Sequence, residues 1–140
     1  MTEVNLFKFL SDNILLVATA LFSGGMLLWP VLRRVGGGAV STLEATLLMN
    51  QQNALVLDVR DAGEYGKGHL LNARNIPLAQ LDERASEVEK FKAKPVLLVC
   101  ETGQRAAKAA TALRRQGFQQ VSVLGGGIGA WQQAGLPLEK

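Results

Sequence analysis

Hydrophobic and polar positions divide the chain into two unlike parts. From Ile14 to Leu32, 19 residues follow one another without a charge. As a helix that rises ~1.5 Å per residue, this run is about 28 Å long, close to the ~30 Å hydrocarbon core of a bilayer. Trp29 suits a membrane interface, and two arginines follow the run. The sequence therefore predicts one transmembrane helix over residues 14–32, preceded by an N-terminal tail over residues 1–13.

Two other interpretations of this run compete with an anchor. A buried core helix normally has a polar stripe, and here only Thr19 and the Ser23–Gly25 patch interrupt the apolar residues. A cleavable signal peptide has a basic N-terminal region, whereas Glu3 and Asp12 outweigh Lys8 in this chain. We therefore expect an uncleaved single-pass anchor, and the alternative is export after signal-peptide cleavage.

The basic residues that flank the run predict its orientation. Arg33 and Arg34 follow it, whereas Lys8 and the α-amino group precede it. Because Lys and Arg are enriched on the cytoplasmic side of membrane helices, we expect the rest of the chain to lie in the cytoplasm. A lone cysteine that stays a thiol also fits a reducing compartment.

Beyond a basic, glycine-rich linker over residues 33–40, the pattern changes to alternating short strands and helices. Gly36–Gly38 is expected to form a flexible hinge in this linker. A capping box of Ser41 and Glu44 predicts the start of a first helix that stops near Asn50. Apolar β-rich runs predict strands over residues 54–59, 73–77, 95–100 and 120–124. Helical spacing of apolar residues predicts helices over residues 78–91, 105–116 and 128–134.

This order of elements predicts the fold class. Strands that alternate with helices at this spacing indicate right-handed βαβ units and a small, mostly parallel α/β sheet flanked by helices. The run from Pro95 to Cys100 is the most continuously apolar, which places it at the centre of the sheet. Residues 41–140 are therefore expected to form one domain.

Composition excludes several classes of function. The chain is 48% hydrophobic and 19% charged, which excludes a disordered polymer. One cysteine and one histidine exclude a disulfide scaffold and argue against a zinc-ribbon or histidine-rich metal site. A net charge of +3 with 6% aromatic residues is too weak a signal for nucleic-acid binding.

Cys100 is the candidate for chemistry. In open parallel sheets, ligands bind beyond the carboxyl ends of the strands, where this cysteine lies. A strand-to-helix loop directs backbone N–H groups at one point, and the following helix adds a partial positive charge, so both favour a thiolate. Gly103 allows the tight curl and Arg105 adds a cation. Taken alone, however, a lone cysteine at the end of a core strand is more often a small buried hydrophobe.

Three longer motifs change this interpretation. DVRDAGEYGKGHLLNARNIPL (Asp58–Leu78), CETGQR (Cys100–Arg105) and LGGGIGAW (Leu124–Trp131) occur in this order and together span most of residues 41–138. They resemble the signature, the active-site loop and the closing element of the rhodanese family. The resemblance implies a single rhodanese domain and a sulfurtransferase activity.

The resemblance also implies roles for residues. Cys100 would take a sulfane sulfur from thiosulfate or a persulfide and pass it to a thiol or a cyanide-like acceptor, without metal or cofactor. The backbone of the active-site loop would hold that sulfur, and this loop comprises Glu101, Thr102, Gly103, Gln104 and Arg105. Asp58, Arg60 and Glu64 would support the site: we expect Arg60 to pair with Glu64, and Asp58 to hydrogen-bond near the loop. His69 is expected to be a framework residue, and Trp131 a core residue.

Two departures from the family pattern limit what carries over. Ala106 stands where many members have serine, which removes one side-chain hydrogen bond. Glu101 places a negative charge beside the nucleophile, which opposes thiosulfate and makes a small or protein persulfide an equally good donor.

Two other functions compete with a free-standing sulfurtransferase. Related phosphatases and arsenate reductases have one more residue between cysteine and arginine, where this chain has four. A membrane-tethered sulfur relay or interaction module with little catalysis of its own is the other alternative. Retention of Cys100, Gly103 and Arg105 favours an enzyme over a lapsed module.

Overall fold

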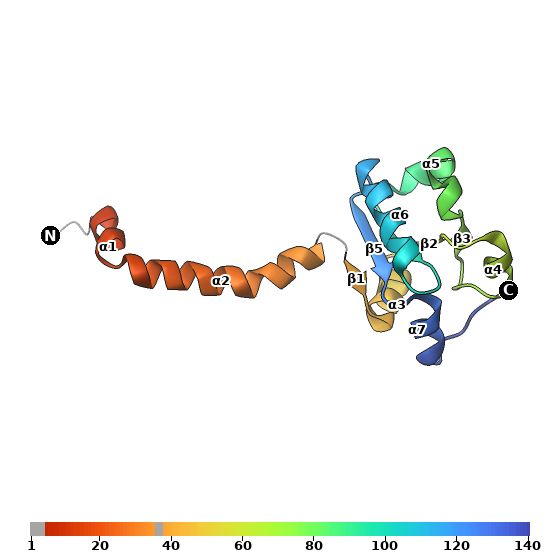
Figure 1. Ribbon diagram of the computed structural model, residues 1–140, viewed down its shortest axis with the longest axis horizontal. Coiled ribbons are helices and arrows are strands. Elements are labelled where there is room, and N and C mark those ends of the chain that lie inside the picture. The colour runs from red at the N-terminus through yellow and green to blue at the C-terminus, as the bar shows by residue number, and fades with distance from the viewer. Residues whose placement is uncertain (1–4, 36–37) are drawn as a thin grey trace. The chain divides into compact units, whose positions relative to one another are not determined.

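The computed structural model describes residues 5–35 and 38–140 (Figure 1). The chain divides into two compact units, Met1–Val35 and Gly36–Lys140. Gly36 and Gly37 of the expected hinge lie outside the described residues.

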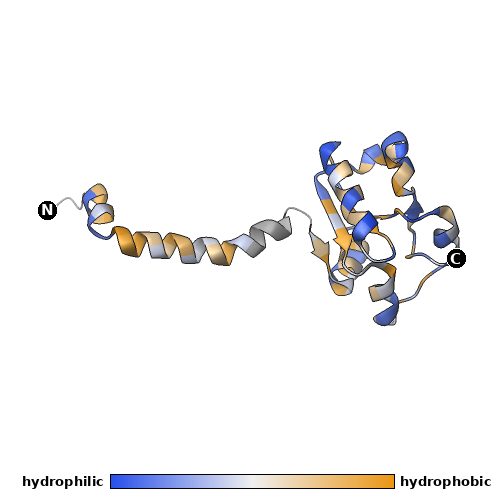
Figure 2. Cartoon of the chain, viewed as in Figure 1, coloured by the Kyte–Doolittle hydropathy of each residue, from blue (hydrophilic) through white to orange (hydrophobic). Residues whose placement is uncertain are grey.

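The N-terminal unit consists of two helices, α1 (Leu6–Asp12) and α2 (Ile14–Val35). The Asn5 side chain caps α1 by accepting a hydrogen bond from the Phe7 N–H at 3.2 Å. Hydrophobic residues cover much of α2 (Figure 2). Among the described residues, neither helix alone is long and apolar enough to cross a bilayer; α1 and Ile14–Trp29 qualify only as a pair, with a bend of 87° between them. The transmembrane helix over residues 14–32 therefore stays a prediction.

The second unit is built on a parallel sheet. Among the described residues, five strands pair in the order β1-β5-β4-β2-β3, and every pair is parallel. The central position of β4 confirms the prediction from its continuous apolar run. The strands are β1 (Ala39–Val40), β2 (Leu55–Asp58), β3 (Arg74–Asn75), β4 (Pro95–Val99) and β5 (Gln120–Leu124).

Helices cover both faces of this sheet, so the α/β fold predicted from the sequence is confirmed. The α-helices are α3 (Thr42–Gln51), α4 (Ala62–Lys67), α5 (Leu81–Arg84), α6 (Gln104–Arg115) and α7 (Gly127–Gln133), and two 3₁₀ segments are η1 (Leu78–Gln80) and η2 (Ala85–Phe91). The capping box of α3 forms as predicted, since the Ser41 side chain and Glu44 bond each other's backbone N–H groups.

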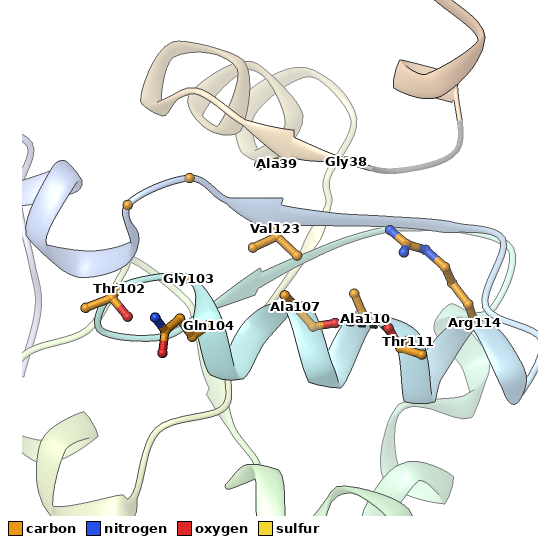
Figure 3. Close-up of a pocket in the computed structure, with 12 residues that line it drawn as sticks. Gly38, Ala39, Thr102, Gly103, Gln104, Ala107, Ala110, Thr111, Arg114 and Val123 are labelled. Carbon is orange, nitrogen blue, oxygen red and sulfur yellow. Dashed lines mark hydrogen bonds between the residues drawn. The ribbon is translucent and has the colours of Figure 1, made fainter. Parts of the chain in front are cut away.

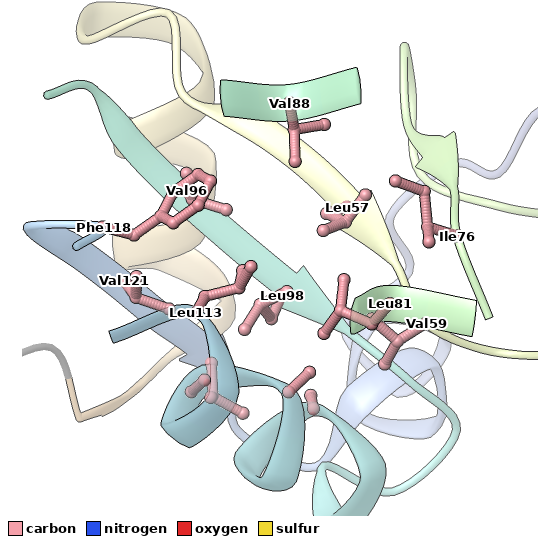
Figure 4. Close-up of a cluster of buried hydrophobic side chains, with 14 of the residues drawn as sticks. Leu57, Val59, Ile76, Leu81, Val88, Val96, Leu98, Leu113, Phe118 and Val121 are labelled. Atoms are coloured by element: carbon pink, nitrogen blue, oxygen red, sulfur yellow. The ribbon is translucent and has the colours of Figure 1, made fainter. Parts of the chain in front are cut away.

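Alternate residues of the strands build two apolar cores, one on each face of the sheet. On one face, Leu57 of β2 and Leu98 of β4 pack with Leu113 of α6 and Val88 of η2 (Figure 4). On the opposite face, residues of the same strands pack against α3 and α7; this second core comprises Ala45, Val56, Leu70, Ala73, Leu97, Val99, Leu124, Ile128 and Trp131. The layered packing fixes β4, and with it the position of the residue that follows.

Three segments differ from the sequence-based expectation. Residues 78–91 form η1, α5 and η2 instead of one helix, although Leu81 and Val88 still reach the core as their spacing predicted. β1 lies inside the expected linker, because its two residues pair with β5 and extend the sheet. α4 was not predicted, since its six residues include two glycines and carry little apolar pattern.

Candidate active site

Cys100 follows β4 directly and opens a tight loop, residues 100–105, that leads into α6; we call it the Cys100 loop. Cys100 as a whole is only 1% exposed. The Sγ atom accepts hydrogen bonds from the backbone N–H groups of Gly103 at 3.0 Å and Ala106 at 3.4 Å. Gly103 has φ +101°, a left-handed conformation that glycine adopts without a steric penalty. The predicted curl and convergence of N–H groups on the sulfur are therefore present.

The sulfur acts as the N-terminal cap of α6. Gly103 occupies the N-cap position and has no side chain to satisfy the first N–H groups of the helix. The Sγ of Cys100 accepts the N–H of Ala106, which is otherwise an orphan donor of the first turn. A helix N-terminus also favours negative charge at this point. The sequence gives no signal for this role of Ala106, because the residue acts through its backbone N–H and not through its side chain.

The start of α7 holds the Cys100 loop from the other side. Ile128 donates its N–H to the Cys100 carbonyl at 2.9 Å, and Gly129 donates to the Glu101 carbonyl at 3.3 Å. Gly127 has φ +58°, and a Cβ atom there would overlap the carbonyl oxygens of Cys100 and Glu101. The glycines of LGGGIGAW thus allow two backbone segments to approach closely.

Trp131, at the end of the same motif, lies in the core as expected. It is 4% exposed and packs in the apolar cluster with Ile128. Its indole N–H donates to the Pro137 carbonyl at 2.9 Å, which satisfies the polar atom of the buried ring.

Arg60 pairs with Asp58, so the expected pair of Arg60 with Glu64 is wrong. The buried Asp58 carboxylate accepts from Nε of Arg60 at 3.0 Å and from Nη2 at 2.8 Å. Burial disfavours the charge on Arg60, but the hydrogen bonds and charge of Asp58 outweigh burial and raise the pKa of Arg60. Residues two apart in an extended segment point to the same side, and this spacing is the signal that predicts the pair.

The same guanidinium reaches the Cys100 loop. Its Nη1 lies 3.4 Å from the Glu101 carboxylate, and its Nη2 donates to the Gly68 carbonyl at 2.7 Å. Asp58 therefore contacts the loop through Arg60, and the charge of Glu101 lies beside a cation.

Glu64 pairs with Arg105, the last residue of the Cys100 loop. The two guanidinium nitrogens of Arg105 lie 2.7 and 2.9 Å from the two carboxylate oxygens, a bidentate geometry. The hydrogen bonds from Arg105 are the main cause that lowers the pKa of Glu64 to about 2, and the carboxylate in turn raises the pKa of Arg105. The pair joins the loop to α4.

His69 lies away from the sulfur, in the contact between α4 and the C-terminal segment. Its ring stacks on Tyr65 with 3.8 Å between ring centroids, and its Nδ1 lies 3.0 Å from the Tyr65 carbonyl. Its Nε2 lies 3.5 Å from a carboxylate oxygen of Glu139. Across residues 5–35 and 38–140, no group of three or more His, Cys, Asp or Glu side chains is arranged to hold a metal ion.

Two hollows flank the Cys100 loop. One, of about 320 Å³, is lined by Glu101 together with Arg60, Glu64, Lys67, Gly68, Ile128, Gln132 and Leu138. The other, of about 520 Å³, lies along α6, with Thr102, Gly103 and Gln104 at one end and Arg114 at the other (Figure 3). Of the five predicted loop residues, Glu101 thus lines one hollow and Thr102, Gly103 and Gln104 line the other, while Arg105 lines neither.

The close approach at Gly127 generates a first prediction. Gly127→Ala should lose about 2–4 kcal/mol of unfolding free energy, because the new Cβ meets two carbonyl groups at a positive φ. Urea denaturation measures the loss of unfolding free energy, and the alkylation rate of Cys100 measures how accessible the sulfur in the loop has become. Gly129→Ala is the matched control, since its Cβ would lie 3.8 Å from the nearest atom, the Glu101 oxygen. Equal unfolding free energies of the two variants would contradict the prediction, because they would show that the Cys100 loop moves aside without an energetic cost.

The pair of Glu64 and Arg105 generates a second prediction. Because the folded state lowers the pKa of Glu64 from 4.5 to about 2, its contribution is complete above pH 4.5 and disappears as the pH falls to about 2. Each side chain is 34% exposed, so solvent screens the pair and we expect about 1 kcal/mol. Glu64→Gln should therefore destabilise the protein at pH 7 but have less effect at pH 3. A constant difference between these pH values in urea denaturation would contradict the role of the ion pair.

Known proteins are similar to this chain in sequence and in structure. A family model described as a rhodanese-like domain matches residues 41–134. "Uncharacterized protein YibN" of Escherichia coli K12 is 38% identical over 96 residues, 68% of this chain and 67% of YibN. "Thiosulfate sulfurtransferase GlpE" of Coxiella burnetii is 36% identical over 93 residues, 66% of this chain and 85% of GlpE. The crystal structure of a rhodanese-related protein from Thermoplasma volcanium aligns with a TM-score of 0.62 and 33% identity over 72% of this chain and 96% of that chain. The chain therefore belongs to the rhodanese-like family.

Proposed function

We propose that this protein is a sulfurtransferase that carries a sulfane sulfur on Cys100. The observation that carries the proposal is the geometry at the sulfur, where two backbone N–H groups point at Sγ at the N-terminus of α6. Such an environment stabilises a thiolate, which is the nucleophilic form of cysteine. The similarity to GlpE, whose name states thiosulfate sulfurtransferase, supports the same chemistry.

The first half-reaction loads the enzyme. The Cys100 thiolate attacks the outer sulfur of the donor, a bond forms between the two sulfurs, and the donor leaves with its electron pair. With thiosulfate the leaving group is sulfite, and with a persulfide it is a thiolate. The product is a Cys100 persulfide whose terminal sulfur carries the negative charge, and N–H groups of the loop and the helix N-terminus stabilise that charge.

The second half-reaction transfers the sulfur from the Cys100 persulfide to an acceptor. A thiolate or a cyanide-like acceptor attacks the terminal sulfur, the sulfur–sulfur bond breaks, and the Cys100 thiolate is restored. Neither half-reaction consumes an oxidant or a metal. The residues around the sulfur position the loop: Arg60 holds Glu101, and Glu64 holds Arg105.

The charges around the loop favour a persulfide at least as much as thiosulfate. Three basic side chains near the loop, Arg60, Lys67 and Arg105, are matched by the three acidic side chains of Asp58, Glu64 and Glu101. A balanced surface gives little electrostatic attraction to a dianion. The donor class we propose is therefore thiosulfate or a persulfide, with the persulfide carried by a small molecule or a protein.

The burial of Cys100 supports a second candidate function, a sulfur relay that transfers sulfur to or from a protein partner. The thiol of a residue that is 1% exposed reaches a donor or acceptor only when the loop opens or a narrow group enters. A protein partner that opens the loop would make transfer efficient only within a complex. A phosphatase is the weaker alternative, since four loop residues between cysteine and arginine make a narrow cradle for a tetrahedral oxyanion.

We also propose that residues 14–32 anchor the protein in a membrane, with the domain in the cytoplasm. The uncharged run and its exposed side chains support an anchor, because Leu15, Phe22 and Leu27 are 70% or more exposed on a helix in water. Arg33 and Arg34 support the orientation.

The persulfide is the direct test of the proposed activity. Incubation of the protein with thiosulfate or with cysteine persulfide should add one sulfur, about 32 Da, to the intact mass. Cys100→Ser should add nothing and should keep its fold, because the hydroxyl still accepts the two N–H groups. Circular dichroism checks the fold, and the donor that loads the protein identifies the substrate class. An unchanged wild-type mass with both donors, or a gain in Cys100→Ser, would refute the proposal.

The anchor is tested separately. The full chain should sediment with membranes, resist extraction by alkaline carbonate and keep an N-terminus near Met1, because the apolar run matches the thickness of a bilayer. A variant without residues 1–35 serves as control and should remain in the supernatant. An N-terminus after Ser23 would establish signal-peptide cleavage instead. Digestion of the domain by protease added outside intact cells would refute the cytoplasmic orientation.

A further inference from the structure

Charged residues are distributed unevenly along the strand direction of the domain. Because all strands are parallel, their amino ends share one edge of the sheet, and the Cys100 loop lies at the opposite edge. The segments that lead into β4 and β5, residues 81–94 and 114–119, together with Arg74 at the start of β3, contain seven basic and four acidic residues. The remainder of residues 36–140 contains five basic and six acidic residues. Hydrophilic residues are conspicuous over α5 and where α6 leads into β5 (Figure 2). The amino edge is therefore the positive end of the domain.

Three cations surround one aromatic ring at this edge. The Arg74 guanidinium carbon lies 5.5 Å from the centroid of the Phe91 ring, Lys90 Nζ lies 5.3 Å from it, and Lys94 Nζ lies 5.8 Å from it. Each cation gains from the face of the ring, but the three like charges repel one another. All three side chains are exposed, so an anionic partner could reach them and relieve this repulsion.

A pocket of about 260 Å³ adjoins this cluster. Arg74 and Phe91 line it together with the amide side chains of Asn50, Asn53 and Asn72. None of the described residues that line it is acidic, so its polar side chains offer N–H donors suited to the oxygens of an anion. Leu71, another lining residue, is 56% exposed. Cations beside an exposed apolar side chain are typical of proteins that bind the surface of an anionic bilayer.

The attachment of the N-terminal segment lies on the same side. The chain enters β1 at Ala39, the amino end of a strand that runs parallel to β5. If residues 14–32 are anchored as proposed above, the domain is held at its amino-end side. The Cys100 loop lies beyond the carboxyl end of β4.

We propose that this amino-edge surface, formed by Arg74, Lys90 and Lys94 around Phe91 with the exposed Leu71, binds the anionic phospholipid headgroups of the bilayer that holds the chain. The proposal rests on the proposed anchor and goes beyond the sulfur chemistry. Its consequence is that the Cys100 loop points away from the bilayer, toward donors and acceptors in the aqueous phase. A nucleic acid is less suited, because the cluster is small and has an apolar rim.

Lysine labelling of the full chain tests this surface. The protein is placed in nanodiscs of phosphatidylcholine alone or with phosphatidylglycerol, and acetylation rates are read by mass spectrometry. In anionic discs at low salt, Lys90 and Lys94 should react about fivefold more slowly than in neutral discs, which corresponds to about 1 kcal/mol per basic residue at such a surface. High salt should erase the difference. Lys67 and Lys108, both exposed and outside the amino edge, are internal controls that should not change.

Matched charge-reversal variants sharpen the test. Hydrogen exchange over residues 70–74 and 88–94 should be slower in anionic than in neutral discs. The Lys90→Glu, Lys94→Glu variant should lose this difference, and the Lys67→Glu, Lys108→Glu variant, with the same change in net charge, should keep it. Equal exchange of the wild type in both kinds of disc would overturn the proposal.

The remaining outcomes separate the sources of an effect. A chain that does not enter discs refutes the anchor, and the labelling is then repeated with preformed vesicles of the two compositions. Slower labelling with anionic vesicles alone would support the surface, and equal labelling would overturn it. Protection by glycerol phosphate without any bilayer would assign the site to a soluble phosphate compound and overturn the bilayer assignment.

Discussion

The structure of the site depends on one interaction, the capping of α6 by the sulfur of Cys100. The helix begins after a glycine, which cannot satisfy its first N–H groups, and the sulfur accepts the N–H groups of Gly103 and Ala106 in place of a capping side chain. The nucleophile and the stability of α6 are therefore linked. The proposed persulfide would retain Sγ as the acceptor of these N–H groups, so its formation would leave the cap of α6 in place.

The loop around this sulfur is held from three independent directions. Backbone N–H groups at the start of α7 bond its first two carbonyls, Arg60 contacts Glu101, and Glu64 binds Arg105. The first contact comes from residues 128–129 and the other two from Arg60 and Glu64, each 41 residues before its partner in the loop. They meet because parallel strands bring their carboxyl ends to one edge of the sheet.

The parallel fold and the position of Cys100 could be predicted from the sequence because long apolar runs carry a strong signal. β4 is such a run, and its centre position follows from burial on both faces. Short elements such as β1 and α4 carry no such signal, since tertiary contacts select them. The ion pairs could not be predicted in the same way. Glu64 and Arg105 are 41 residues apart, and other acidic and basic side chains compete as partners for each of them. The role of Ala106 has no side-chain signature at all.

One oxygen of Glu64 performs two tasks. Its Oε2 accepts the N–H of Asp61 at the start of α4 at 3.1 Å, and the same atom binds the Arg105 guanidinium at 2.7 Å. The first turn of a short helix and the last residue of the Cys100 loop therefore share a single acceptor. If the contact with Arg105 were lost, the Oε2 atom would be left to the N–H of Asp61 alone. The stability of the α4 N-terminus and the position of Arg105 in the Cys100 loop are thus linked through one carboxylate.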